Sequence, residues 1–117
     1  MSSGKVNETG SISGFEPPWY YAGEEADLKE GKLLRLEAGG KDVLLIKNEG
    51  QVYVFSNICP HARCPLDRGR LEDFTLTCLC HGRRFDIRTG KCLNDMLELK
   101  KYEWKLEAGK IGVKIEG

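Results

Sequence analysis

The sequence has no apolar run longer than four residues, and it does not begin with an apolar segment. A helix that crosses a bilayer needs about 20 consecutive apolar residues, and the run Val43–Ile46 reaches only four. The first residues, MSSGKVNETGSISG, lack the hydrophobic core of a secretory signal. We therefore expect a cytoplasmic protein with no membrane span, in which residues 1–16 form a disordered leader.

The chain also lacks net charge, since it has 18 basic and 18 acidic side chains. A domain without an excess of basic residues is a poor candidate for nucleic-acid binding. The charge is nevertheless unevenly placed, because six of the seven arginines lie within residues 59–91. That segment is either ordinary solvated surface or a docking patch for an acidic partner, because complementary charge steers encounter.

Histidine is scarce, and its two copies are not scattered. His61 lies in CPHARCPL at residues 59–66, and His81 lies in TCLCHG at residues 77–82. The same two stretches hold four of the five cysteines. Thiolate and imidazole are the side chains that bind soft and borderline metals, so their clustering points to a metal site.

Short β-like runs surround the two Cys/His stretches, and glycine-containing turns such as AGG and NEG separate some of them, as in hairpins. The segment Glu24–Lys32 is expected to form a helical turn that Gly31 ends. The sequence therefore predicts an all-β fold, a small sandwich or barrel with a loop-rich insert between Ser56 and Cys92. The expected strands are Trp19–Gly23, Lys32–Glu37, Asp42–Lys47, Gln51–Phe55, Leu99–Leu106 and Ile111–Ile115.

Three interpretations of the Cys/His stretches compete. One is a structural Cys2His2 zinc site, although zinc modules usually pair cysteine with cysteine and histidine with histidine in each loop. Another is that no metal binds and the cysteines are buried as small apolar side chains. The abundance of proline, glycine, arginine and aspartate in both stretches argues against such burial. The third is an iron–sulfur site.

The third interpretation rests on a resemblance. CPHARCPL followed by CLCHGRRFDIRTG resembles the two boxes of Rieske [2Fe–2S] proteins. The resemblance extends from about Trp19 to Ile115, because GKLLRLEAGGKDVLLIKNEGQVYVFSNICPHA is similar to the strands before the first box of small Rieske ferredoxins. It implies the Rieske fold over residues 17–117, with a cluster-binding subdomain at about residues 56–92 on one end of a small antiparallel β base.

The resemblance also implies a ligand set for one [2Fe–2S] cluster per chain. Cys59 and Cys78 would bind one iron, and His61 and His81 would bind the other. Two imidazoles in place of two thiolates make the cluster less negative, which raises its reduction potential relative to all-cysteine clusters. Histidines at an exposed tip would give the electron a short path to a docked partner.

Two further cysteines, Cys64 and Cys80, lie one in each stretch and are not ligands in this interpretation. In the high-potential Rieske proteins of respiratory complexes, cysteines at these positions form a disulfide that joins the two loops. We therefore predict a Cys64–Cys80 disulfide, although the reducing cytosol favours two thiols. Cys92 is expected to be a lone structural thiol.

Other positions depart from the high-potential pattern, which places a serine and a tyrosine where this chain has Arg83 and Phe85. Without hydroxyls to hydrogen-bond the cluster, we expect a midpoint potential of roughly −150 to +50 mV, in the lower part of the Rieske range. The stretch CLNDMLEL also lacks the proline of the family's covering loop, so Met96 or Leu97 is expected to shield the site instead.

These features predict a soluble, monomeric electron carrier between a flavoprotein or ferredoxin reductase and a terminal oxygenase or other acceptor, not an enzyme. Arg63, Arg83 and Arg84 are the predicted docking residues. Two alternatives stay open. One is an electron-transfer subunit of a multicomponent oxygenase or of a nitrite-reductase-like enzyme. The other is a redox sensor that uses Cys64 and Cys80.

Overall fold

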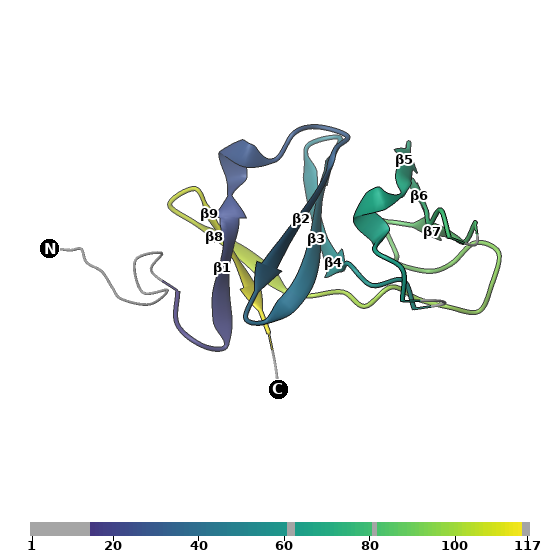
Figure 1. Ribbon diagram of the computed structural model, residues 1–117. Coiled ribbons are helices and arrows are strands. Elements are labelled where there is room, and N and C mark those ends of the chain that lie inside the picture. The colour runs from purple at the N-terminus through teal and green to yellow at the C-terminus, as the bar shows by residue number, and fades with distance from the viewer. Residues whose placement is uncertain (1–14, 61–62, 81, 116–117) are drawn as a thin grey trace, which may run out of the picture.

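The computed structural model describes residues 15–60, 63–80 and 82–115, and this part of the chain is built from antiparallel strands. The strands form three sheets of three, in the orders β1-β9-β8, β2-β3-β4 and β5-β6-β7. The sheets follow one another along the molecule, with β5–β7 at the end away from β1 (Figure 1). The strands are β1 (Trp19–Glu24), β2 (Leu33–Ala38), β3 (Lys41–Asn48), β4 (Gln51–Ser56), β5 (Arg70–Glu72), β6 (Thr75–Thr77), β7 (Arg84–Asp86), β8 (Trp104–Glu107) and β9 (Lys110–Lys114).

The middle sheet explains the longest apolar run. Strand β3 is buried on both faces, because successive side chains of a strand point to opposite sides. Leu44 and Ile46 enter a core shared with the insert, whereas Val43 and Leu45 enter a second core shared with β1 and β9. A strand that is covered on both faces has a continuous apolar run in its sequence. The all-β prediction is confirmed, and the fold has three layers of sheet.

The folded part of the chain begins before residue 17, the predicted domain start, because Phe15 packs on the sheet β1-β9-β8. Residues 1–14 of the expected leader lie outside the described residues, but Phe15 is only 6% exposed. A methyl group at Gly112 of β9 would come within 2.3 Å of the Phe15 ring, so the ring lies directly on that strand. The expectation that residue 15 belongs to a disordered leader is therefore wrong.

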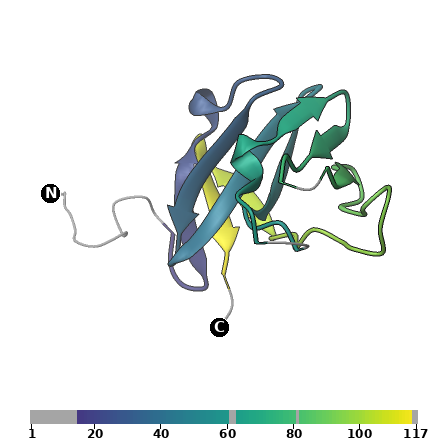
Figure 2. The same ribbon diagram turned by 45° about the vertical axis from the view of Figure 1, so that its right-hand side comes forward.

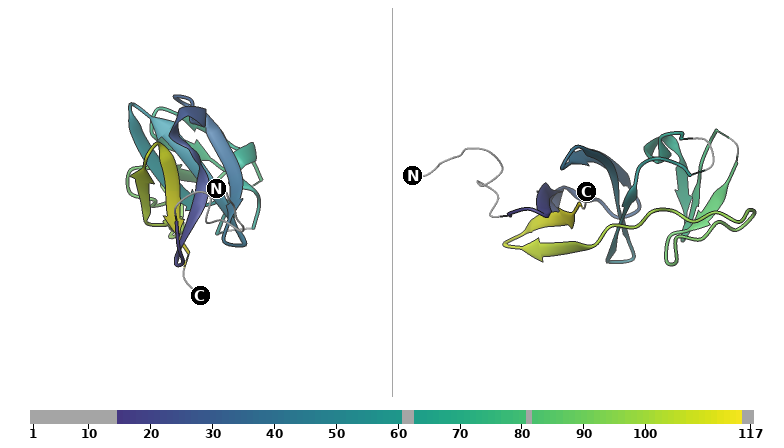
Figure 3. Two further views of the ribbon diagram at one scale, coloured as in Figure 1. Left: turned by 90° about the vertical axis from the view of Figure 1, so that its left-hand side faces the viewer. Right: turned by 90° about the horizontal axis from the view of Figure 1, so that it is seen from below.

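The predicted strand Leu99–Leu106 is divided between two sheets. Lys100 accepts a hydrogen bond from the backbone N–H of Ser56 at 2.8 Å, and Tyr102 donates one to Val54 at 3.1 Å, so this segment runs beside β4. Only Trp104–Glu107 forms β8 and pairs with β9. Figure 3 shows the returning chain as a long extended connection from the insert to the base.

Two other expectations need adjustment. The predicted helical turn is the single 3₁₀ turn η2 (Glu25–Asp27), which Leu28 closes with a backbone hydrogen bond to Glu25. The insert is less loop-rich than expected, because it contains the 3₁₀ turn η3 (Leu66–Arg68) and the sheet β5-β6-β7. This small sheet packs against the middle sheet through the first core (Figure 2). Among the described residues there is no helix long and apolar enough to cross a membrane.

Candidate metal centre

Two short loops at the end of the insert close in the same way, and we call them finger 1 (residues 59–64) and finger 2 (residues 78–83). In finger 1 the N–H of Cys59 donates to the carbonyl of Cys64, and the N–H of Arg63 donates to that of Cys59, both at 2.8 Å. In finger 2 the N–H of Cys78 donates to Arg83 at 2.8 Å, and that of Gly82 donates to Cys78 at 2.9 Å. The first residue of each finger is thus a cysteine held by two backbone hydrogen bonds.

The fifth residue of each finger has the same unusual backbone conformation. Arg63 has a φ of 56° and Gly82 a φ of 70°, both in the left-handed region. That conformation costs roughly 1–2 kcal/mol for a residue with a side chain but almost nothing for glycine. The glycine in CHGR therefore suits finger 2, whereas finger 1 reaches the same turn with an arginine.

The two cysteines that begin the fingers are buried. Cys59 is 0% exposed and Cys78 is 1% exposed, and both belong to the first core together with Leu66 and Phe85. The expectation that the polar composition of the loops keeps their cysteines out of a core is therefore wrong for these two. Their burial excludes water from the two sulfurs. His61 and His81, the other two predicted ligands, lie outside the described residues.

The two fingers are joined covalently. Cys64 and Cys80 form a disulfide with an S–S distance of 2.03 Å and a Cα–Cα distance of 6.5 Å. The sulfur atoms of Cys64, Cys78 and Cys80 all lie within 4.8 Å of one another. Because two of these three sulfurs are bonded to each other, only Cys78 of the group retains a thiol that can bind a metal. Cys64 is half-buried and Cys80 is exposed.

Finger 1 has a buried polar support that sequence reasoning missed. Asn57 is 0% exposed, and its side chain donates to Asp67 at 2.8 Å and to Asp42 at 3.3 Å. Its side-chain oxygen accepts the N–H of Asp67 at 2.8 Å, and its carbonyl accepts the N–H of Leu66 at 2.7 Å. The residue therefore ties both ends of finger 1 to the middle sheet. An asparagine two positions before the first cysteine was the available signal.

Finger 2 has an exposed counterpart, Asn94, in the stretch that was expected to cover the site. Its side-chain oxygen accepts the N–H of Arg84 at 3.1 Å and the thiol of Cys92 at 3.2 Å, and its NH₂ donates to Gly82 at 3.3 Å. Leu97, one of the two expected shields, packs against the first core. Met96, the other, is 98% exposed.

The predicted docking arginines have different environments. Arg63 and Arg84 are exposed, and no ion pair involves either within residues 15–60, 63–80 and 82–115. Arg83 is partly buried and donates to Asp95 at 2.9 Å, so its charge is already neutralised. Of the three predicted docking arginines, only Arg63 and Arg84 therefore present a positive charge without an ion pair among the described residues.

Arg88, a further arginine of the same segment, is also neutralised. Its side chain donates to Asp86 at 3.1 Å and lies 4.4 Å from the centre of the Phe74 ring. Chiefly through its side-chain hydrogen bond, Arg88 holds the pKa of the Asp86 carboxyl below its usual value. This pair closes the turn after β7.

The donors that the structure describes fit a metal cluster. Cys59 and Cys78 each begin one of the two matched loops, and both are shielded from water. The disulfide between Cys64 and Cys80 joins the loops, so the two thiols are held as a pair. Thiolates at such positions suit zinc and iron–sulfur clusters alike. Chemistry alone therefore leaves the predicted zinc and iron–sulfur interpretations open.

Comparison with known proteins decides between them. The family model of the Rieske [2Fe–2S] domain matches residues 18–103. The ferredoxin component of the naphthalene 1,2-dioxygenase/salicylate 5-hydroxylase systems of Ralstonia is 33% identical over 100 residues, which cover 84% of this chain and 96% of that protein. The ferredoxin component of biphenyl 2,3-dioxygenase of Rhodococcus jostii is 34% identical over 93 residues, covering 78% of this chain and 87% of the relative.

The fold leads to the same family. The ferredoxin of carbazole 1,9a-dioxygenase from Nocardioides aromaticivorans superimposes with a TM-score of 0.73 at 27% identity, covering 82% of this chain and 98% of that one. A Rieske domain binds a [2Fe–2S] cluster, so membership of this family favours the iron–sulfur interpretation over the zinc interpretation. The family model matches most of the chain, the relatives have nearly the same extent, and two buried thiols lie at matched positions. This protein therefore belongs to the Rieske [2Fe–2S] family.

Proposed function

We propose that this protein carries single electrons from a reductase to a terminal oxygenase. The observation that carries the proposal is the matched pair of buried cysteines, Cys59 and Cys78, at the start of two cross-linked fingers. The relatives support it, because they are named ferredoxin components of oxygenase systems and the chain covers nearly their full length.

The residues have separate tasks in this proposal. Cys59 and Cys78 bind one iron as thiolates, and His61 and His81 bind the other as neutral imidazoles. When bound, the cluster supplies reversible one-electron chemistry. Burial of the two cysteines keeps water from the sulfurs, the disulfide fixes the spacing of the fingers, and Arg63 and Arg84 offer positive charge to an acidic partner.

A carrier is favoured over an enzyme, because four protein ligands leave no open metal position for a substrate. The relatives cited are carrier components of oxygenase systems rather than the oxygenases. The predicted alternative of a dedicated subunit of a multicomponent enzyme differs only in how permanently the partner is bound. Size-exclusion chromatography of the chain alone is expected to give a monomer, and chromatography of the chain mixed with a terminal oxygenase addresses that point, because a dedicated subunit would elute with it.

The test combines metal analysis with spectroscopy. The purified protein should contain two irons and two inorganic sulfides per chain, and its dithionite-reduced form should give the EPR signal of a mixed thiolate/imidazole [2Fe–2S] cluster. Cys59→Ser, His61→Ala, Cys78→Ser and His81→Ala should each lose the cluster, whereas the control Cys92→Ser should keep it. A protein that binds zinc and shows no EPR signal would overturn the proposal.

Electron transfer needs its own assay. The reduced protein should be reoxidised by a terminal oxygenase, and Arg63→Glu and Arg84→Glu should each slow that step more at low than at high salt. Arg88→Glu serves as the control, because Arg88 is already paired with Asp86. The predicted cytoplasmic location also remains a proposal, which cell fractionation with a tagged chain would test.

A further inference from the structure

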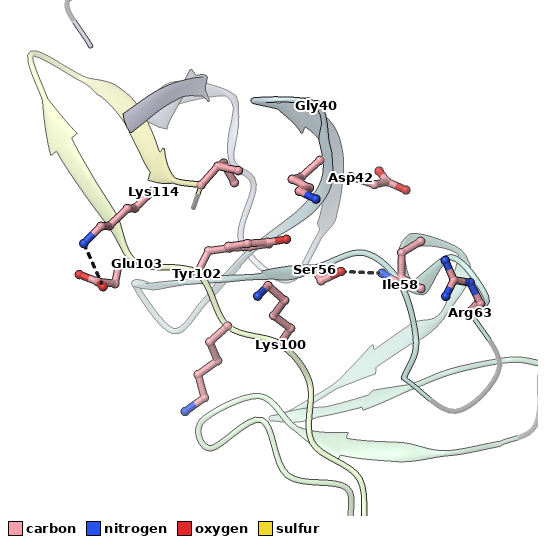
Figure 4. Close-up of a pocket in the computed structure, with 12 residues that line it drawn as sticks. Gly40, Asp42, Ser56, Ile58, Arg63, Lys100, Tyr102, Glu103 and Lys114 are labelled. Atoms are coloured by element: carbon pink, nitrogen blue, oxygen red, sulfur yellow. Dashed lines mark hydrogen bonds and ion pairs between the residues drawn. The ribbon is translucent and has the colours of Figure 1, made fainter. Parts of the chain in front are cut away.

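A pocket of about 430 Å³ lies at the waist of the molecule, between the base and finger 1. Its walls come from three places: the β2–β3 turn with Lys41, the start of the insert with Ser56 and Ile58, and the returning segment with Lys100 and Tyr102. Arg63 reaches it from finger 1. Figure 4 shows Lys100 and Arg63 on opposite sides of Ser56. None of these residues belongs to the predicted ligand set.

The charge around this waist pocket is not balanced. Five cations line it (Lys41, Arg63, Lys100, Lys101 and Lys114), against the two carboxylates Asp42 and Glu103. Asp42 pairs with Arg35, outside the lining set, and accepts a hydrogen bond from Asn57. Glu103 pairs with Lys114, one of the five cations, at 3.7 Å.

Several of the cations therefore lack a counter-charge. Six ion pairs are present among the described residues, and Lys114 is the one lining cation that takes part in any of them. The other four cations, Lys41, Arg63, Lys100 and Lys101, take part in none. Like charges that face one pocket repel each other, and a bound anion would relieve that repulsion. The pocket has the electrostatics of a site whose ligand is negative.

The inner wall supplies neutral hydrogen-bonding groups. The Ser56 hydroxyl accepts the N–H of Ile58 at 3.3 Å, and Tyr102 lines the same pocket. The ammonium group of Lys100 lies 5.4 Å from the centre of the Tyr102 ring. Hydroxyl, ammonium and guanidinium groups that face one space are the donors that oxyanions accept from.

The backbone holds these donors in place. The N–H of Ser56 donates to Lys100 at 2.8 Å, and that of Tyr102 donates to Val54 at 3.1 Å, so the two walls are joined by sheet-like bonds. A site whose walls are already fixed loses less entropy when a ligand binds. The long lysine and arginine side chains are the parts that a ligand would still have to order.

We propose that the waist pocket binds an oxyanion with two or more negative charges, of the phosphate class. Four of the five cations have no ion-pair partner among the described residues, which favours a multiply charged ligand. The hydroxyls of Ser56 and Tyr102 favour one with several acceptor oxygens. Because Arg63 belongs to finger 1 and Lys41 to the base, a bound anion would join the two parts of the fold. The proposal does not depend on the electron acceptor.

The experiment measures phosphate binding to the cluster-loaded protein. Inorganic phosphate is titrated by calorimetry and by thermal unfolding at constant ionic strength, with chloride as the replacement anion. The melting temperature should rise with phosphate, because a ligand of the folded state stabilises it by mass action. The double variant Lys41→Gln/Lys100→Gln should weaken binding at least tenfold. The control Lys29→Gln/Lys32→Gln removes the same charge from exposed positions outside the pocket and should bind as the wild type does.

Two further arms make each outcome decisive. A tetraglutamate peptide is titrated in the same way, to separate a free oxyanion from the carboxylates of a protein partner. Saturable phosphate binding that only the pocket variant loses supports the proposal. Binding of the peptide without phosphate, equal weakening in both double variants, or no saturable binding overturns it. Lys100→Gln alone, with visible absorption as the check of cluster content, replaces the double variant if that does not fold.

Discussion

Asn57 and Asp67 bond each other twice, at the two ends of finger 1. The amide NH₂ of Asn57 donates to the Asp67 carboxylate, and the backbone N–H of Asp67 donates to the amide oxygen of Asn57, both at 2.8 Å. One residue precedes Cys59 and the other follows Cys64, so the pair closes the base of the finger. Because Asn57 is fully buried, water cannot replace these bonds.

Replacing Asn57 should therefore lower the free energy of unfolding more than an average side-chain truncation does. Asn57→Ala leaves buried donors and acceptors without partners, which we expect to lower the free energy of unfolding by about 1–3 kcal/mol. It should also speed the loss of iron. Asn48→Ala is the control, since Asn48 is also buried but makes one side-chain bond, to Asp73, away from the fingers. Urea unfolding and iron release test both, and a wild-type rate of iron release in Asn57→Ala would refute the role.

Gly69→Ala should disturb finger 2 from a distance. A methyl group at Gly69 would lie 2.2 Å from the carbonyl oxygen of Thr77, the residue before Cys78. Backbone cannot move aside as a flexible side chain can, so we expect a loss of roughly 1–3 kcal/mol and a lower iron content. Gly50→Ala, where a methyl group meets nothing within 4 Å, should cost stability through its positive φ but leave the iron content unchanged. Equal iron contents in the two variants would argue against the contact.

The disulfide should stabilise the protein without holding the cluster. It closes a loop with a sequence separation of 16, which is worth about 3 kcal/mol in the chain-entropy model. The double variant Cys64→Ser/Cys80→Ser should therefore unfold at a lower urea concentration than the control Cys92→Ser. Each variant should carry its cluster at the start of the measurement. Thiol alkylation without reductant, after cluster removal, should modify three of the five cysteines. Modification of all five would show that the bond does not form in solution.

The same bond separates a carrier from a redox sensor. Cys80 is exposed, so a dithiol can reach the disulfide. For a plain carrier, titration with dithiothreitol should open the disulfide, and the visible spectrum of the oxidised cluster should keep its shape. The variant Cys64→Ser/Cys80→Ser, which has no disulfide to open, is the control. A sensor would show a spectral change in the wild type alone.

The reduction potential should fall at roughly −150 to +50 mV. Arg83 and Phe85 stand where the high-potential pattern has a serine and a tyrosine, and neither side chain contains a hydroxyl. Arg83 instead bonds Asp95, and Phe85 is buried in the core. Arg83→Ser should raise the potential by adding a hydrogen-bond donor. Asp95→Asn removes the ion pair without adding a hydroxyl and should not reproduce that rise. Voltammetry measures all three proteins, and a wild-type value above about +200 mV would contradict the argument.

One tyrosine should ionise late, far from the fingers. Tyr21 donates a hydrogen bond to Glu24 at 2.5 Å, and this bond, with smaller effects of burial and of nearby carboxylates, raises the pKa of Tyr21 to about 12. A raised pKa means that the contribution to stability is present below the ordinary value of 10 and is lost as the pH rises through 12. Glu24→Gln should lower the pKa of Tyr21. NMR of the labelled tyrosine ring carbon, assigned with Tyr21→Phe, checks it, and an unchanged pKa would exclude the bond as the cause.

Much of the fold could be predicted because its signals are local. Glycine turns set the hairpins of the middle sheet, and the run Val43–Ile46 marks a strand buried on both faces. What failed depends on contacts between distant segments. Residues 99–103 have the composition of one strand with β8, yet they pair with β4, and only the three-dimensional path determines that switch. Phe15 is buried because Gly112, far along the chain, leaves room for its ring.

The site divides in the same way. The spacing of the cysteines and histidines predicts the two fingers, because ligand chemistry restricts it. The disulfide between Cys64 and Cys80 was predicted only from the resemblance to high-potential Rieske proteins, and the structure contains it. The supports were missed, because asparagine is common in loops. The position of Asn57 two residues before Cys59 was the only local signal for it, and Asn94 had none. The burial of Cys59 and Cys78 was misjudged for a similar reason, since composition averages over side chains that point in opposite directions.

The bond between Ser56 and Lys100 has a consequence for how this fold can vary. The insert leaves the base at Ser56 and returns beside it at Lys100, where one backbone hydrogen bond of 2.8 Å joins the two points. A segment whose ends already touch can be exchanged or grafted without opening the sheet that carries it, provided that the new insert again covers Leu44 and Ile46 of the first core. The redox module and its platform can therefore diverge separately, and a foreign cluster-binding insert spliced at these two residues is the natural starting point for making hybrids.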